Sequence, residues 1–206
     1  MVMLAPVGLV LFLAGPVQTE PAIRRAPARS GLSWAEADAL SETLEQVERR
    51  FKAGKPLRRE PLVVTEVQLN SYLNLTLGPK LPPGISELEV QMTGGGLLVQ
   101  GKVDLDRVPL KRPSDGGFSM LRFLSGVVPV VLSGRLNGQD GLGAIDLQEA
   151  HLAGVSLPIA LVAQLVSTAS RTAELPQGFD IHAPFPLPYA MRRVRFEPGR
   201  AVVDFQ

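Results

Sequence analysis

The chain contains no cysteine, and this absence removes several classes of site at once. Disulfide scaffolds, thiolate zinc sites, cysteine nucleophiles and cysteine-linked lipid anchors are all excluded. Histidine is scarce, since His151 and His182 are the only two, and this argues against a histidine-rich metal site or a histidine-based triad. Aromatic residues make up only 5% of the chain, so a buried core must be mostly aliphatic.

Neither sign of charge dominates. The formal net charge is +1, which gives no indication of a nucleic-acid partner. The 206 residues are 45% hydrophobic and 20% charged, an ordinary globular composition that excludes wholesale disorder. The 18 prolines and 20 glycines predict many turns, and therefore much β structure.

The first residues read as a processing or anchoring segment. Residues 2–17 carry no charged side chain, and Val7 to Ala14 fit the apolar region of a secretory signal. The run is shorter than the roughly 17–25 residues that a membrane-spanning helix needs. We therefore expect a signal peptide or weak membrane anchor over 1–17 and a flexible linker over 18–32. Either places the rest of the chain outside the bacterial cytoplasm, in the periplasm or cell envelope, with tethering by the N-terminal segment as the alternative to cleavage.

An amphipathic helix is expected over 33–53. Ser33 and Glu36 have the spacing of a capping box, and Gly54 is placed to close the helix. Apolar residues recur at steps of three and four and form one stripe: Trp34, Ala37, Leu40, Leu44, Val47 and Phe51.

A second capping box, Thr65 with Gln68, predicts a short helix that ends at Gly78. Its apolar face consists of Leu69, Tyr72, Leu73 and Leu77. From Ile85 to Leu105 the apolar period becomes two, interrupted by three glycines, which predicts a hairpin of long strands.

The remaining elements follow from shorter patterns. Pro129 lies inside an apolar run and predicts an edge or bulged strand, whereas Pro158 is placed at the start of a helix that is apolar on nearly every side. The expected strands cover 127–136, 142–152, 179–185, 191–196 and 201–205, and the expected helices cover 118–124 and 159–173.

Four phrases carry a resemblance by their order along the chain. They are VTEVQLNSYLN at 64–74, LPPGISELEVQMTGGGLLVQGKVDL at 81–105, LSGRLNGQDGLGAIDLQEAHLAGVSLPIALVAQLV at 132–166 and LPYAMRRVRFEPGRAVVDF at 187–205. In this order the chain resembles small bacterial cell-envelope proteins related to the tubular lipid-binding (TULIP-like) superfamily, of the YceB and LmeA type. The chain departs from them in lacking a lipobox cysteine and in its additional N-terminal amphipathic helix.

The resemblance implies an α+β fold for a single domain over 33–206. In that fold a strongly curved antiparallel sheet is wrapped around a long apolar helix, which matches Pro158–Ala173, and an apolar groove beside the helix holds an acyl chain. The expected lipid-binding groove is lined by Leu161, Leu165, Val166 and Ala169. An aliphatic lining suits an acyl chain, since each buried methylene contributes roughly 0.8 kcal/mol. The alternative is that these residues are ordinary core.

Two basic groups are candidates for contact with anionic head groups. The first has six cations before the next acid, Glu60, and the second shares one strand face; together they are Arg49, Arg50, Lys52, Lys55, Arg58, Arg59, Arg193 and Arg195. The alternative is a solvated helix end, whose dipole also favours cations, and a solvated strand face.

The expected function is therefore non-enzymatic binding of a lipid or acyl chain, for storage, shielding or transfer. The alternative is an envelope scaffold that contacts a protein partner through the helix over 33–53. Asp104 and Asp106 share a strand face by their spacing and are interpreted as solvated. Because no nucleophile–base pair or metal-ligand spacing can be assembled, we expect no enzyme, no catalytic residue, no metal and no cofactor. The expected partners are a lipid and a membrane surface, not nucleic acid.

Overall fold

A computed structural model describes residues 31–206 except 82, 95, 108–124 and 172–174. The expected signal peptide or anchor, nearly all of the expected linker and the expected helix over 118–124 therefore lie outside the described residues. In the part that is described, no helix combines the length and the apolar character needed to cross a bilayer.

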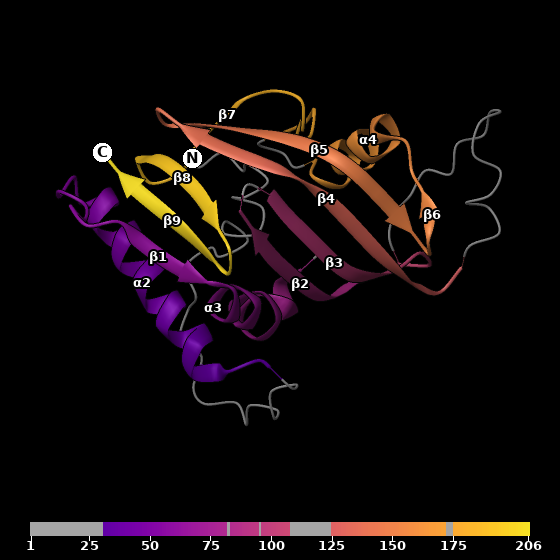
Figure 1. Cartoon of the computed structure of the whole chain (residues 1–206), viewed down its shortest axis with the longest axis horizontal. Helices are drawn as coiled ribbons and strands as arrows, with labels where there is room; N and C mark the ends of the chain where they lie inside the picture. Colours follow the sequence, from indigo (N-terminus) through magenta and orange to yellow (C-terminus); the bar gives the residue numbers. More distant parts are fainter. Residues whose placement is uncertain (1–30, 82, 95, 108–124, 172–174) are drawn as a thin grey trace.

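The described residues form a mixed α+β structure, which confirms the predicted class with its large antiparallel sheet (Figure 1). Three α-helices and nine strands follow one another in the order α2 (Trp34–Lys52), β1 (Leu62–Thr65), α3 (Glu66–Ser71), β2 (Ile85–Thr93), β3 (Gly96–Asp104), β4 (Val127–Gln139), β5 (Leu142–Leu152), β6 (Val155–Ser156), α4 (Ile159–Ala169), β7 (Phe185–Pro186), β8 (Met191–Glu197) and β9 (Arg200–Phe205). A π-helical turn, Tyr72–Thr76, and a 3-10 turn, Gly78–Lys80, extend α3.

All nine strands belong to one sheet with the order β1-β9-β8-β4-β3-β2, and β5 pairs with β4, β6 and β7. The sheet is antiparallel throughout and does not close. Its two halves meet at a single residue pair, Gly138 of β4 with Val194 of β8. The short hairpin β8–β9 with β1 therefore forms one limb, and the long strands β2 to β5 form the other (Figure 1).

Helix α2 begins and ends as the sequence predicts, with one difference at its first turn. The Ser33 hydroxyl accepts a hydrogen bond from the Glu36 amide at 3.4 Å. In a complete capping box the Glu36 side chain would accept a hydrogen bond from the Ser33 amide. Here that amide donates to the hydroxyl of Ser71 at 2.9 Å instead. At the other end Gly54 has a positive φ of 61°, and the Lys55 amide donates back to the helix at 2.9 Å. This pairing closes the helix with a Schellman-type turn.

The helical segment after β1 also covers the open edge of β2. The capping box of Thr65 and Gln68 is complete. From the same segment Glu66 accepts a hydrogen bond from the Met92 amide, and the Asn70 side chain bonds both the amide (2.7 Å) and the carbonyl (2.9 Å) of Val90. Asn74 continues the series, since its side-chain amide donates to the Leu88 carbonyl at 2.6 Å. Side chains four residues apart thus pair with an edge strand as a neighbouring strand would.

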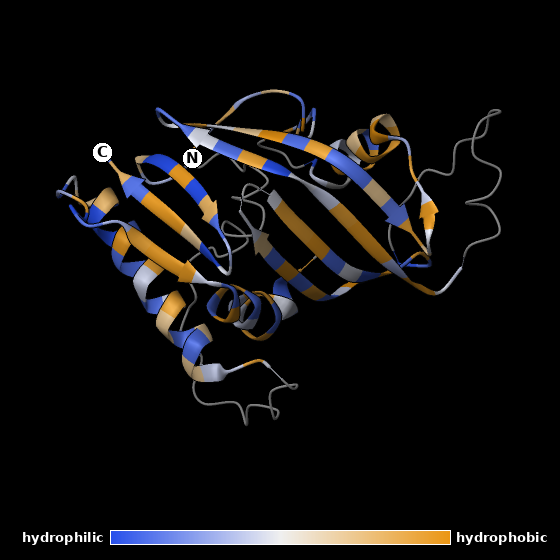
Figure 2. Ribbon diagram, viewed as in Figure 1, coloured by the Kyte–Doolittle hydropathy of each residue, from blue (hydrophilic) through white to orange (hydrophobic). Residues whose placement is uncertain are grey.

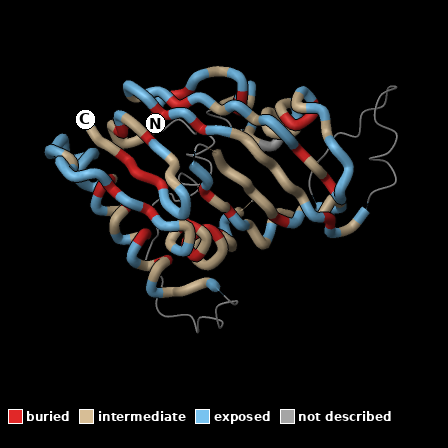
Figure 3. Tube along the Cα trace, in the orientation of Figure 1, coloured by how far each residue is buried: buried red, intermediate tan, exposed pale blue. Residues whose placement is uncertain are grey.

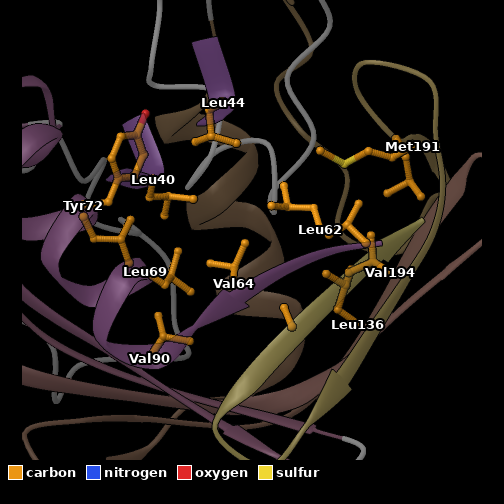
Figure 4. Packing of buried hydrophobic residues seen from close by; sticks show 14 of the residues in the cluster. Leu40, Leu44, Leu62, Val64, Leu69, Tyr72, Val90, Leu136, Met191 and Val194 are labelled. Atoms are coloured by element: carbon orange, nitrogen blue, oxygen red, sulfur yellow. The ribbon is translucent and has the colours of Figure 1, made fainter. Parts of the chain in front are cut away.

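The main core lies between these helices and the sheet (Figure 4). The predicted apolar face of the short helix is confirmed, since its four side chains are buried. Most of the predicted α2 stripe is buried as well, although Trp34 is only partly buried and Phe51 remains 47% exposed. The core cluster includes Leu40, Leu44, Leu62, Val64, Leu69, Tyr72, Val90, Leu136, Met191 and Val194.

One strand prediction was wrong in part, and of the two alternatives predicted from Pro129, an edge or a bulged strand, one is found. The stretch 179–185 is not a strand until Phe185, because the Asp180 carboxylate accepts a hydrogen bond from the His182 amide and folds the chain into a turn. β4 has the predicted bulge, between Ser133 and Gly134, but it is central rather than an edge. Pro129 is tolerated there because the pairing of β4 with β5 starts only at the next residue.

Helix α4 covers Ile159–Ala169, and Thr172 and Ala173, the last two residues of the expected longer helix, lie outside the described residues. Its contacts with the sheet are made mainly with β5 (Figure 1). A sheet wrapped around a long apolar helix is not what the described residues show. The helix is also not buried on all sides, since Ala160 and Gln164 are exposed.

Candidate functional site

The register of the long strands separates an apolar face of the sheet from a polar one. Partner residues in an antiparallel sheet project to the same side. Val99 of β3 partners Leu132 of β4, which partners Ala150 of β5. We call this side the inner face, because Val90 of β2, a core residue, partners Val99. Figure 2 shows the resulting bands of high and low hydropathy along β3, β4 and β5.

The opposite side, the outer face, carries the polar residues. One step along the strands, Gln100 partners Val131, which partners His151. Arg135 partners Asp146 on the same side, and both are exposed. The inner positions of β3 and β4 are apolar or glycine throughout, whereas the outer positions mix polar residues with Leu98 and Val131, so the inner face is better suited to bind apolar groups.

The middle of the inner face is apolar but only partly buried. We call this surface the central inner face. Its residues all have intermediate exposure, in contrast to the sealed core beneath α2, and Figure 3 shows the difference along β3 and β4. They are Leu97, Val99, Val103, Val130, Leu132, Ile145 and Leu147.

The inner face is sealed at the end of β4 and β5 that leads to β8. Phe179 and Phe185 pack edge to face with ring centroids 5.7 Å apart, and both are buried. A side chain at Gly143 would collide with the Phe185 ring, so this glycine lets the ring lie directly on β5. Leu187 also packs closely over Gly138, next to Val194. The apolar surface that remains partly open is therefore the one in the middle of the long strands.

The four predicted groove residues of α4 do not share one environment. Leu161 is sealed, with 7% of its surface exposed, while Leu165 and Val166 are partly buried. Val166 packs against the main core cluster. The side chain of Ala169 is not among the described ones. Val166 therefore packs against the core cluster to which the inner face also contributes. Leu161 is an ordinary buried core residue.

Sequence reasoning missed the strand residues of the central inner face as a site. A partial signal was present, since Val128, Val130, Leu132 and Leu136 recur at even spacing along the strand, although Val131 between them is apolar too. It identifies one apolar face of a strand. It does not reveal that the middle of that face escapes full burial, because this depends on where distant segments pack.

Six predicted cations lie together where α2 passes into β1. All six side chains are exposed. Arg49 and Lys52 pair with acids one turn earlier in α2, at 3.4 and 2.6 Å. The Arg50 guanidinium donates to the Pro56 carbonyl at 3.0 Å. Lys55, Arg58 and Arg59 follow the end of the helix, and none has an ion pair with another described residue.

Arg193 and Arg195 lie on the outer face of β8, on one side of the strand as their spacing predicts. Asp204 of β9 partners Arg193 in register and forms an ion pair with Arg195 at 3.4 Å. The two arginines therefore face away from the inner apolar surface and do not border it.

The α2 stripe that was the candidate for protein docking is occupied by this chain's own core. Its middle residues have at most 8% exposure: Ala37, Leu40, Leu44 and Val47. A scaffold function through that stripe would require unpacking the core.

The polar residues that could support chemistry are dispersed. Among the described residues no three His, Cys, Asp or Glu side chains gather as a metal site would require. His151 lies 3.7 Å from Glu149 on the outer face. Asp106 lies in the turn after β3 rather than on the predicted strand face, and its carboxylate accepts a hydrogen bond from the Gly126 amide.

Both tyrosines of the chain are held in their neutral form. Burial raises the pKa of Tyr189 to about 12, and the nearby Glu48 carboxylate adds to this shift. Burial, followed by the proximity of Tyr189, Glu45 and Glu48, raises the pKa of Tyr72 further still. These hydroxyls belong to the packing of α2, not to a reactive centre.

No protein family, curated protein or solved structure matches the chain.

Proposed function

We propose that this protein binds a lipid through its acyl chain on the central inner face and performs no covalent chemistry on it. The observation that carries the proposal is the partial exposure of an entirely apolar surface in the middle of the long strands. Exposed apolar surface on one contiguous patch is unfavourable unless something covers it. An acyl chain laid across the strands supplies that cover.

The chemistry of the surface favours an acyl chain over other apolar ligands. Its seven side chains are all aliphatic, so it offers no aromatic platform for a nucleobase or a sugar ring. Burial of each methylene contributes roughly 0.8 kcal/mol, and this gain accumulates along the chain. In the proposed complex α4 flanks the bound chain through Leu165 and Val166, two residues of the expected groove that are partly buried.

The proposal extends to the setting of the protein. The apolar N-terminal segment and the resemblance to tubular lipid-binding envelope proteins both support an exported protein of the bacterial envelope. Storage, shielding and transfer of a lipid all require the same reversible burial, so the binding step is what an experiment must establish first.

The direct test is titration of the full chain with cis-parinaric acid, a fatty acid whose fluorescence rises in apolar surroundings. We expect saturable binding. Val99→Thr with Val130→Thr should weaken it at least about 10-fold, because each unpaired hydroxyl against an acyl chain costs about 1–3 kcal/mol. These substitutions keep the side-chain volume, and thermal unfolding of each variant verifies the fold.

Val131→Thr is the matched control, since it changes the same strand on the outer face. It should leave the affinity unchanged. Absence of saturable uptake, or an equal loss in the inner and outer variants, would refute the proposal.

A further inference from the structure

We infer that the end of the molecule where α2 passes into β1 docks on the surface of an anionic lipid bilayer, with Phe51 entering the interface. The inference deepens the proposed function and rests on it for the source of the lipid. The docking itself is measurable without any bound acyl chain.

Phe51 is the first observation. By its spacing it belongs to the packed stripe of α2, yet 47% of its surface is exposed. The ring contacts Tyr189 edge to face, with centroids 6.0 Å apart. This contact orients the ring without covering it. An exposed aromatic ring beside cations is typical of side chains that enter a membrane interface.

The second observation is the charge around this ring. Three cations lie in the last turn of the helix and three lie beyond it. The helix dipole explains the first three, since cations are favoured at a helix C-terminus. It does not explain Lys55, Arg58 and Arg59, because the effect fades within one turn.

These three cations have no acidic partner among the described residues, and the next acid along the chain is Glu60. Arg192, exposed at the start of β8, follows Tyr189 closely in sequence and so joins the same end of the molecule. Exposed cations without an acidic partner in the described part of the chain, following closely after an exposed ring, combine electrostatic and apolar attraction, which an anionic bilayer satisfies together. An acidic protein would satisfy only the first.

The test is sedimentation of the full chain with vesicles of phosphatidylglycerol and phosphatidylcholine, compared with phosphatidylcholine alone. We expect preference for the anionic vesicles, weakened by salt. The triple variant Lys55→Gln, Arg58→Gln and Arg59→Gln should lose binding about 5-fold for each charge removed, or about 100-fold in all. Phe51→Ser should also weaken binding, and by an amount that salt does not change.

A matched triple variant, Lys80→Gln, Arg135→Gln and Arg171→Gln, removes the same charge from exposed positions elsewhere. It should bind anionic vesicles almost as the natural chain does. An equal loss in both triple variants, or no preference for anionic vesicles, would overturn the inference. The inference would also be overturned if the chain bound polyglutamate as strongly as anionic vesicles and Phe51→Ser left vesicle binding unchanged. That result would indicate an acidic partner instead.

Uptake of cis-parinaric acid separates this inference from the proposed function. The first triple variant should bind the fatty acid normally, because its cations lie between α2 and β1 and not on the strands β3 to β5 that form the central inner face. Site-specific vesicle binding in a chain that takes up no fatty acid would remove the proposed function and leave the docking surface in place.

Discussion

Gly178 occupies a position at which the backbone excludes any side chain. Its φ is +75°, and a Cβ there would collide with the carbonyl oxygen of Ser167 in α4. Gly154 has a similar φ of +78° but open space around it. Comparison of the two glycines therefore separates the cost of the backbone conformation from the cost of the collision.

We predict that Gly178→Ala destabilises the protein clearly more than Gly154→Ala. Both variants must adopt the left-handed conformation, at a cost of about 1–2 kcal/mol. Only Gly178→Ala must also displace the Ser167 backbone, for about 1–3 kcal/mol more. Urea unfolding of the two variants measures the difference. Equal losses would mean that the segment before Phe179 does not pack on α4 as described.

The tyrosines give a prediction that depends on pH. Tyr72 and Tyr189 are the only two in the chain, so tyrosinate absorbance reports on them alone. The pKa of Tyr189 is raised to about 12 and that of Tyr72 is raised too, above the ordinary value of about 10. At about pH 11 the folded protein should show little tyrosinate, whereas the protein in denaturant should be mostly ionised.

The same shifts determine how stability varies with pH. Between pH 10 and 12 the folded state retains protons that the unfolded state has released, so the free energy of unfolding falls as the pH rises. The contribution is complete below pH 10. Normal ionisation near pH 10 in the folded protein would contradict the burial of these rings beneath α2.

At this scale the sequence indicated which side chains are apolar but not which neighbours they meet. The spacing of Ser33 and Glu36 suggested a reciprocal cap, yet Ser71, 38 residues later, takes the Ser33 amide. Phe51 continues the helical stripe by its spacing, but it packs only edge to face on Tyr189, far along the chain, and stays 47% exposed. Neither outcome follows from local pattern, because each depends on a tertiary contact.

Among the elements, the pairing of the α3 segment with β2 has the clearest consequence. We predict that Asn70→Ala destabilises the protein by about 1–3 kcal/mol, since it leaves both the amide and the carbonyl of Val90 without their partner. Hydrogen exchange at the Val90 amide should accelerate, and the uncovered edge should promote self-association, measured by sedimentation velocity.

Asn137→Ala provides the comparison, because Asn137 is exposed on the outer face of β4. It should change neither the stability nor the exchange rate at Val90. If Asn70→Ala left that exchange rate unchanged, side-chain pairing would not be what protects the edge of β2.

The elements with a regular period were predictable, and the irregular ones were not. The period of two gave β2, β3, β8 and β9, and the two capping motifs gave the starts of α2 and α3. The stretch 179–185 also alternates in part, but the turn at Asp180 replaces the ladder with a local hydrogen bond. Pro129 suggested an edge or bulged strand, and the choice between them was not predictable because the sequence does not say where the pairing of β4 with β5 begins.

For the whole molecule, the sheet rather than α4 provides the candidate lipid surface. The strand order β9-β8-β4-β3 joins distant parts of the chain, and this order decides which alternating residues share a face. Sequence reasoning placed the site on the most apolar helix, since that segment is conspicuous by itself. How far the central inner face is buried depends on where the helices pack against the core that this face adjoins, and the strands do not encode that.

Competition of saturated fatty acids of increasing length against cis-parinaric acid tests this account most directly. If the central inner face buries the acyl chain, each added methylene should strengthen binding by roughly 0.8 kcal/mol, about 4-fold, until the surface is filled. Val99→Thr with Val130→Thr should lower this gain per methylene, and Val131→Thr should not. An affinity that does not depend on chain length would contradict acyl-chain burial as the basis of the function.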